Sequence, residues 1–489
     1  MKIQAFNPYL PSYEYVPDGE PYVFGERLYV FGSHDEFDGK GFCIKDYVCY
    51  SAPIDNLGDW KYEGVIYKRT QDPVNPKGKQ YMNAPDVCQG PDGRYYLYYQ
   101  LQLENTTSVA VADKPEGPYE YYGVVRHADG KKYGLHKDAY NFDPSVFIDD
   151  DGKIYMYTGF SPDSGLLRWV MGLRGGTYKG GSVVELMPDM LTLAGPETAT
   201  IPGNLFAKGT EFEEHPFFEA SSIRKINNIY YLVYSSILSH ELCYATSKSP
   251  RGPWKYGGTI VSIGDIGLPG ITKKEARNFT GNTHGGMVCV KGQWYIFYHR
   301  QTNQQKCARQ GCAEKISIEQ DGSIKQVEVT SCGLNSGPLK AIGNYEARIA
   351  CNLWGDHGTL DYNKVRLKET EYPYFTQTGV DRESNPDQFI RNMKNGAVAG
   401  FKYFNFDEDK PSSISVKIKG SGNGKIMVYT ELNPFEKGDE SNLVAKIDIK
   451  AVETISEMNS IITNVTGVKA LYFQYLGEGY LDFISFCLQ

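Results

Sequence analysis

Residues 215–236, HPFFEASSIRKINNIYYLVYSS, decide the fold. In this stretch Glu219 opens a short strand, a polar turn follows at Asn227 and Asn228, and a second strand rich in tyrosine and aliphatic residues comes next. Two such runs joined by a polar turn are typical of a β-hairpin. We therefore predict a hairpin with a carboxylate at its start.

The same pattern occurs four more times in the first two thirds of the chain. The other copies are PDGEPYVFGERLYVFGS (17–33), APDVCQGPDGRYYLYYQ (84–100), FDPSVFIDDDGKIYMYTG (142–159) and THGGMVCVKGQWYIFYH (283–299). The tyrosines of their second strands align as Tyr29, Tyr96, Tyr155, Tyr231 and Tyr295, at intervals of 67, 59, 76 and 64 residues. Strand repeats of this size are typical of a β-propeller, so we predict five blades of about four strands.

Each copy carries a polar residue ten to twelve positions before its aligned tyrosine. These residues are Asp18, Asp86, Asp143, Glu219 and His284. If each copy is one blade, the five positions are equivalent and lie where the first strand begins. Because that strand lines the central channel of a propeller, we expect four acids and a histidine to converge on the axis as a reaction centre.

The chemistry that these acids suit is hydrolysis of a glycosidic bond. That reaction needs one carboxylic acid to protonate the leaving oxygen and one carboxylate to activate water or to attack carbon. Asp18, Asp143 and Glu219 meet this need, because a third negative charge raises the pKa of a neighbouring acid and keeps it protonated. The adjacent Phe142 is expected to contact substrate. For any one of these acids alone, a turn or cap carboxylate is the alternative.

Three further residues have two interpretations each. His284 is either a packed core histidine or faces a cation or water in the channel; one histidine cannot make a zinc site, and a hydrated Ca²⁺ or Na⁺ is the ion we expect. Arg300 is predicted to bind substrate hydroxyls or to balance the acids, the alternative being a surface ion pair. Asp86 is predicted to contact substrate, although it also fits a turn that leads into a strand.

The remaining segments complete an all-β chain. Residues 160–214 read as a long excursion of a kind that is often functional and could wall the pocket, and a hairpin on Asp321 and Gly322 is predicted to complete the last sheet. From about residue 345, short alternating strands with polar turns predict a β-sandwich. We therefore predict a five-bladed β-propeller over residues 1–340 and a jelly-roll-like β-sandwich over residues 341–489.

Composition excludes several classes of partner. The net charge is −8 without a basic block, so we expect no nucleic acid, and no 18-residue apolar stretch is present to span a membrane. The N-terminus lacks the apolar run of a secretory signal, so we expect a cytoplasmic protein. None of the 10 cysteines forms a CxxC pair, which favours free, buried thiols. The 38 tyrosines suit either sheet positions or stacking on sugar rings.

The repeated motifs resemble glycoside hydrolase family 43, whose members include β-xylosidases and α-L-arabinofuranosidases. The resemblance is carried by the hairpin stretches quoted above, extended to residues 7–35, 81–99 and 281–302, and covers roughly residues 5–330. It implies a five-bladed propeller and an inverting mechanism. It also implies that Asp18 is the general base, Glu219 the general acid, and Asp143 the residue that tunes and orients Glu219, with His284 as the axial histidine that binds a metal ion or water.

The tail from about residue 345 resembles a carbohydrate-binding module of family 6, and either binds sugar or braces the first domain. The resulting hypothesis is an exo-glycosidase that releases terminal xylose or arabinofuranose from short plant-polysaccharide oligosaccharides. An endo-arabinanase of the same fold and a non-catalytic carbohydrate-binding propeller are the alternatives. The expected partner is an oligosaccharide, and homo-oligomer formation stays open.

Overall fold

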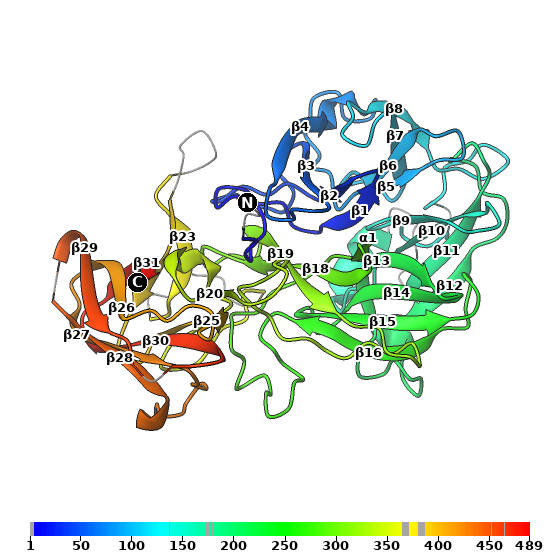
Figure 1. Cartoon of the computed structure of the whole chain (residues 1–489). Helices are drawn as coiled ribbons and strands as arrows, with labels where there is room; N and C mark the ends of the chain where they lie inside the picture. The colour runs from blue at the N-terminus through cyan, green and yellow to red at the C-terminus, as the bar shows by residue number, and fades with distance from the viewer. Residues whose placement is uncertain are drawn as a thin grey trace.

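The structure is a computed structural model that describes residues 4–135, 137–172, 177, 179–363, 371–379, 387–450, 452–463 and 465–489. It contains two β domains that lie side by side, the first built from β1–β19 and the second from β20–β31 (Figure 1). The α-helix α1 (Gly165–Gly172) is short. Within the described residues, no helix has the length and apolarity needed to cross a lipid bilayer.

The first domain consists of five antiparallel sheets in which strands adjacent in sequence pair with each other. The first two sheets contain β1 (Glu20–Phe24), β2 (Arg27–Phe31), β3 (Tyr47–Pro53), β4 (Lys61–Tyr67), β5 (Asp86–Gln89), β6 (Tyr95–Gln100), β7 (Thr107–Ala112) and β8 (Glu120–Val124). The next two contain β9 (Ser145–Ile148), β10 (Ile154–Gly159), β11 (Gly180–Leu186), β12 (Thr198–Pro202), β13 (Phe217–Ile226), β14 (Ile229–Ser236), β15 (Glu241–Ser247) and β16 (Lys255–Ser262). The last contains β17 (Met287–Val290), β18 (Gln293–Gln301) and β19 (Arg309–Ile316). The predicted five-bladed propeller is therefore confirmed.

The N-terminal segment lies along the outer strand of the fifth blade. The Tyr9 N–H donates to the Gly311 carbonyl at 3.2 Å, and the Asn7 side-chain amide exchanges hydrogen bonds with the backbone of Ala313 at 2.8 and 2.9 Å. In Figure 1 the dark blue start of the described chain accordingly lies close to β19. This contact joins the last blade to the start of the chain and closes the ring.

The hairpin on Asp321 and Gly322 forms, but it does not complete the fifth sheet. Ile318 and Ile324 make an antiparallel bridge, and Val327 then pairs with Val261 of β16 in the fourth blade. That part of the prediction was wrong because a hairpin sequence specifies its own turn but not the sheet edge on which the chain continues.

The predicted excursion at residues 160–214 includes the outer part of the third blade. It contains α1 and also β11 and β12, which are the two outer strands of that sheet. The β11 sequence GGSVVEL starts with two glycines, which are depleted in strands, so its strand character was hard to recognise. The described residues before Gly180 and those after Pro202 lie outside these two strands.

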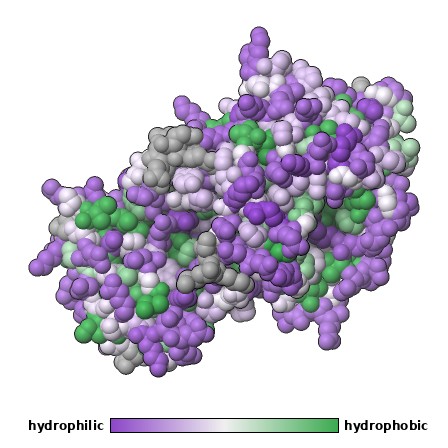
Figure 2. Space-filling view, turned by 45° about the horizontal axis from the view of Figure 1, so that its top comes forward, coloured by the Kyte–Doolittle hydropathy of each residue, from purple (hydrophilic) through white to green (hydrophobic). Residues whose placement is uncertain are grey.

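Tyrosines fill the spaces between neighbouring blades. One cluster joins Tyr29 of β2, Tyr67 of β4 and Tyr99 of β6, all buried. The hydroxyls of Tyr67 and Tyr99 lie 2.8 Å apart, and Tyr99 donates to Asp72 at 2.6 Å. A buried tyrosine needs such a partner for its hydroxyl, and these residues find one between sheets. Figure 2 shows mainly polar side chains on the visible face, with small, separate apolar patches.

The second domain is a sandwich of two sheets around one apolar core. One sheet contains β20 (Leu339–Lys340), β22 (Asn352–Trp354), β25 (Val398–Asn405), β27 (Asn423–Tyr429), β28 (Leu443–Ile449) and β30 (Val468–Glu478). The other contains β21 (Gly343–Glu346), β23 (Tyr374–Gln377), β24 (Gln388–Met393), β26 (Ser413–Gly420), β29 (Val452–Ile461) and β31 (Leu481–Leu488). The alternating pattern of the tail therefore predicted the β-sandwich correctly.

Buried contacts join the two domains. Phe279 of the propeller belongs to the apolar core of the sandwich, where its ring stacks on Tyr362 with centroids 5.3 Å apart. Lys402 of β25 forms an ion pair with Asp265 of the propeller at 3.1 Å, and both side chains are fully buried. Charged groups are buried in this way only when paired, so the interface holds the domains in one arrangement.

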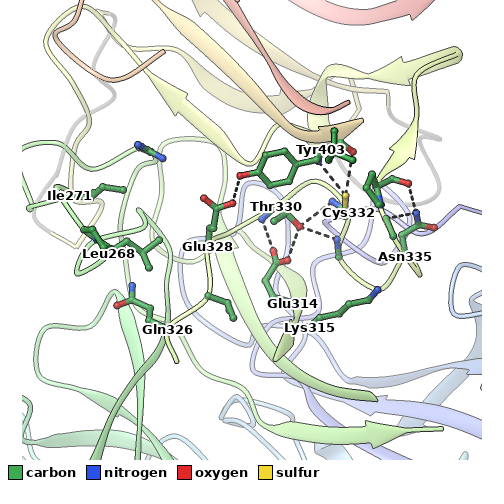
Figure 3. A pocket seen from close by; sticks show the side chains of 17 residues that line it. Leu268, Ile271, Glu314, Lys315, Gln326, Glu328, Thr330, Cys332, Asn335 and Tyr403 are labelled. Carbon is green, nitrogen blue, oxygen red and sulfur yellow. Dashed lines mark hydrogen bonds between the residues drawn. The ribbon is translucent and has the colours of Figure 1, made fainter. Parts of the chain in front are cut away.

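A cavity of about 680 Å³ lies between the domains (Figure 3). Its acids are engaged in local contacts: the Tyr403 hydroxyl donates to Glu328, and the Glu314 carboxylate accepts hydrogen bonds from the Thr330 N–H at 2.6 Å and hydroxyl at 2.7 Å. These carboxylates fix the chain where the propeller meets the sandwich, and the axial acids lie in a different cavity.

Candidate active site

A cavity of about 610 Å³ opens where the first strands of the blades begin. All five blades contribute side chains to it, as does one residue from the second domain, and the lining residues are Asp18, Phe42, Cys43, Asn83, Ala84, Gln102, Phe142, Asp143, Phe160, Phe218, Glu219, Ser239, Asn282, His284, Lys306, Arg309 and Asn363. Five predicted site residues are therefore brought together, and Asp86 and Arg300 are not among them. The aromatic rings that line the cavity are phenylalanines.

Local backbone features aim the acids into the cavity. Asp18 and Asp143 each precede the first strand of a blade with positive φ, 57° and 47°, a conformation that aspartate tolerates better than most residues. Glu219 lies within β13, where the pairing with β14 shifts register on both sides of it. Such bulges redirect a side chain out of the regular alternation. The acids thus converge by two different local devices.

Asp18 is held in its ionised form. Burial opposes ionisation, but the Arg309 guanidinium, whose Nη1 lies 2.8 Å from Asp18 Oδ1, together with His299 and His284, holds the pKa of Asp18 below its ordinary value. The Nδ1 atoms of His299 and His284 lie 3.3 and 3.9 Å from the same oxygen. Arg309 also binds the buried Asp35 through its Nε at 2.8 Å, which fixes the guanidinium. This environment suits a carboxylate that accepts a proton.

Glu219 is in the opposite condition. Burial first, and then the negative charges of Asp143 and Asp18, raise the pKa of Glu219 to about 8. Phenylalanine rings form the apolar wall: Phe142 and Phe160 have centroids 4.7 Å apart, and Phe160 and Phe218 are 5.4 Å apart. A carboxyl group in such surroundings stays protonated at neutral pH and can donate a proton.

Asp143 and His284 form a second charged pair in the cavity. His284 Nδ1 lies 3.5 Å from Asp143 Oδ2, and both side chains are buried. Burial opposes protonation of His284, yet the Asp143 carboxylate, with Asp18 and Glu20, raises the pKa of His284 to about 9. Burial raises the pKa of Asp143, and His284 opposes this shift. The charge of Asp143 therefore influences the protonation of His284 and of Glu219, and its own pKa responds to Asp18.

The donors around His284 fit a hydrated cation. Glu20, on the first strand of its blade, accepts hydrogen bonds at Oε2 from Ser222 (3.0 Å) and Arg224 (3.2 Å), while its buried Oε1 has no hydrogen-bond partner among the described residues. One neutral imidazole and one spare carboxylate oxygen are too few for a closed zinc site and suit an oxygen-preferring ion that keeps most of its water. Such an ion would have to displace the proton that Asp143 keeps on His284. Among the described residues, His215, Glu241 and Cys243 have ligand atoms close enough together to bind an ion directly. They do not line this cavity.

The predicted placement of Asp86 was wrong. In the first hairpin the aligned Tyr29 pairs with Tyr22, and Asp18 lies four residues before Tyr22. In the second hairpin the aligned Tyr96 pairs with Cys88, and Asp86 lies only two residues before Cys88. Ala84 therefore holds the position equivalent to Asp18. Asp86 instead accepts hydrogen bonds from the Tyr22 hydroxyl (2.7 Å) and the Val146 N–H (2.6 Å). It joins the first three blades beside the channel, away from the cavity.

Arg300 also does not contact the cavity. Its guanidinium donates to the carbonyls of Ala350 (2.7 Å) and Arg348 (2.6 Å) and lies 3.8 Å over the Phe375 ring, all in the second-domain part of the chain. Successive side chains of a strand point to opposite faces. Because His299 faces Asp18, its neighbour Arg300 is turned away, and the prediction of a substrate contact was wrong.

The sequence reading missed Arg309 and His299, which hold Asp18. His299 closes the fifth repeat but lies outside the position shared by all five copies, and Arg309 lies on β19, the strand after that repeat. The pairing of Arg309 with Gln301 on β18 brings it to the channel. The sequence signal that could have helped is strand alternation on β18, which allows only one of the neighbours His299 and Arg300 to face the axis.

Comparison with known proteins identifies the family of the chain. The family described as "Glycosyl hydrolases family 43" matches residues 16–324. A xylosidase/arabinosidase of Thermoclostridium stercorarium is 46% identical over 491 residues, covering 100% of this chain and 99% of that protein. A beta-xylosidase of Xylanibacter ruminicola is 31% identical, covering 64% of this chain and 97% of that protein.

One solved structure aligns with about two thirds of this chain. It is described as a family 43 beta-xylosidase/alpha-arabinofuranosidase from a compost microbial metagenome, in complex with xylotriose and in a calcium-free form. It aligns with a TM-score of 0.51 at 26% identity, covering 65% of this chain and 96% of that one. The family match and the full-length relative at 46% identity lead to one conclusion: this chain is a glycoside hydrolase that belongs to glycosyl hydrolases family 43.

Proposed function

We propose that this enzyme is an inverting exo-glycosidase that removes terminal xylose or arabinofuranose from short plant-polysaccharide oligosaccharides. The observation that carries the proposal is the opposite ionisation of two acids in one cavity. The pKa of Asp18 lies below its ordinary value and that of Glu219 is raised to about 8, so a base and an acid coexist at neutral pH. The names of the relatives support the two pentoses as substrates.

In the proposed reaction, Glu219 gives its proton to the glycosidic oxygen as the bond to the anomeric carbon breaks. A water molecule attacks that carbon from the opposite face of the sugar, and Asp18 takes the proton that the water loses. The products are a free pentose of inverted anomeric configuration and the protonated leaving group, which is an alcohol or the shortened oligosaccharide. Asp143 acts through its charge, which keeps Glu219 protonated until the leaving group is in place.

The apolar wall and the axial histidine complete the proposal. Phe142 and Phe160 supply flat faces on which a sugar ring packs, and Phe218 holds Phe160 in place. A hydrated Ca²⁺ or Na⁺ would bind beside Glu20 and the neutral form of His284, and its charge would then replace that of the His284 proton in balancing the buried acids.

The test is hydrolysis of 4-nitrophenyl β-xyloside and 4-nitrophenyl α-arabinofuranoside by the parent, Glu219→Gln and Glu214→Gln. Glu214 is an exposed acid five residues away and serves as the matched control. We expect the parent and E214Q to cleave at least one substrate equally well and E219Q to be slower by about 10²–10⁴-fold. Equal rates for the parent and E219Q would remove Glu219 from the mechanism.

A further inference from the structure

In the part of the second domain that the structure describes, a short strap, defined here as residues 360–363, reaches the catalytic cavity. The strap runs parallel to the propeller segment that leads to His284. The Thr280 N–H donates to the Leu360 carbonyl at 3.0 Å, and the Tyr362 N–H donates to the Thr280 carbonyl at 2.8 Å. Thr280 and Asp361 accordingly form a parallel bridge. The strap is therefore in register with the propeller wall.

Two contacts fix this strap. The Tyr362 ring stacks on Phe279 with centroids 5.3 Å apart and planes within 4°, and both rings are buried in the sandwich core. The Asp361 side chain accepts a hydrogen bond from the Asn363 N–H at 3.1 Å, which holds the turn after Tyr362. The position of Asn363 is thus set by the core of the second domain and by the edge of the first.

Asn363 lines the rim of the cavity. It is exposed, whereas Asp18, Asp143 and His284, which line the same cavity, are buried. Asn282, two residues before His284, also lines the cavity and extends the propeller segment against which the strap runs. In an exo-acting pocket the terminal pentose occupies the deep end beside the acids. A residue at the rim therefore meets the rest of the substrate, which is the leaving group.

We propose that Asn363 of the second domain binds the leaving-group sugar of the substrate, so that the sandwich is a specificity-determining part of the catalytic pocket. This inference rests on the proposed exo-glycosidase function. A side-chain amide offers two donors and an acceptor to the hydroxyls of a sugar. The Xylanibacter ruminicola relative, aligned over nearly its whole length, covers only 64% of this chain, so we assign the strap to leaving-group recognition and leave bond cleavage to the propeller.

The experiment compares full-length parent, Asn363→Ala and Asn459→Ala on two kinds of substrate. One kind is a xylo- or arabino-oligosaccharide, whose leaving group is a sugar, and the other is a 4-nitrophenyl glycoside, whose leaving group has no hydroxyls. The readout is the ratio of kcat/KM for the oligosaccharide to kcat/KM for the nitrophenyl glycoside. Asn459 is exposed on β29, at the far edge of its sheet, and is the matched control.

We expect this ratio to fall about three- to tenfold in N363A, as for loss of one neutral hydrogen bond, and to keep the parent value in N459A. An unchanged ratio in N363A, with thermal unfolding like that of the parent, overturns the inference. An equal fall on both substrates also overturns it, because the residue would then act on the sugar that is released. A parent that cleaves neither substrate would instead refute the proposed function.

Discussion

The guanidinium of Arg309 binds two buried carboxylates at once, Asp18 through Nη1 at 2.8 Å and Asp35 through Nε at 2.8 Å. Asp35 thereby holds in place the positive charge that keeps Asp18 ionised. The proposed base thus depends on a residue 291 positions away in the sequence.

Replacing Arg309 by Met should move the acidic limb of the kcat/KM profile to higher pH by about 1–3 units, since the pKa of Asp18 rises when the neighbouring charge is lost. Arg309→Lys keeps the charge and should shift the limb less. The measurement is kcat/KM against pH for the parent and both variants, with thermal unfolding to verify the fold. An acidic limb that stays in place in R309M would show that Asp18 does not limit the rate there.

The basic limb should report Glu219. Because this residue must be protonated and burial with Asp143 raises its pKa to about 8, we expect kcat/KM of the parent to fall as the pH rises through about 8. In Glu219→Gln the side chain cannot titrate, so the residual activity should lose this limb. E214Q should keep the parent profile, and a basic limb that persists in E219Q would assign that limb to another group.

The same shift predicts how stability depends on pH. Folding raises the pKa of Glu219 from its ordinary 4.5 to about 8, so its contribution to stability is fully present below the unfolded pKa and is lost as the pH rises through about 8. The free energy of unfolding of E219Q, measured relative to that of the parent, should therefore rise by roughly 2 to 4 kcal/mol between pH 5 and pH 9. Denaturant unfolding at both pH values measures the change. Parallel losses in parent and variant would contradict it.

The stereochemistry of the product tests the assignment of Asp18. With Asp18 as a base that activates water, a β-xyloside should release α-xylose first, and an α-arabinofuranoside should release β-arabinofuranose first. Proton NMR of the anomeric signals during the first minutes distinguishes the two anomers before they interconvert. Release of the anomer with retained configuration would make Asp18 a nucleophile.

The ion pair between the domains should be costly to break. Lys402→Met leaves Asp265 buried without its partner charge, at a cost of about 3–5 kcal/mol in the free energy of unfolding. Lys446, exposed on β28, gives the matched control Lys446→Met, for which we expect little change. Denaturant unfolding followed by fluorescence measures both. If K402M were as stable as the parent, the pair would not hold the domains together.

The sequence predicted the features that recur in every repeat. Asp18, Asp143, Glu219 and His284 could be found because each comes at the start of a hairpin, so that their shared position was visible without coordinates. Asp86 was misplaced because counting residues before a tyrosine does not reveal how many of them belong to the turn and how many to the strand. The hydrogen-bond register, which decides this, is a property of two strands together.

The features that sequence reading missed depend on partners distant in the chain. Arg309 reaches Asp18 only because β19 pairs with β18 and the ring closes. Asn363 follows the predicted propeller and joins its cavity through a parallel contact with Thr280, for which a sequence has no local pattern. Such contacts arise from packing between elements, whereas hairpin positions arise from turns.

The seam formed by Asn7 and Tyr9 against β19 has a consequence for synthesis on the ribosome. The chain lengthens from its N-terminus, so these first residues wait while some three hundred more are made before Gly311 and Ala313 emerge to receive them. During that interval the nascent protein is an open arc with unpaired backbone at both ends, where strands of a neighbouring chain could add. Fusing a folded partner immediately before Asn7 would obstruct the step that converts the arc into a ring.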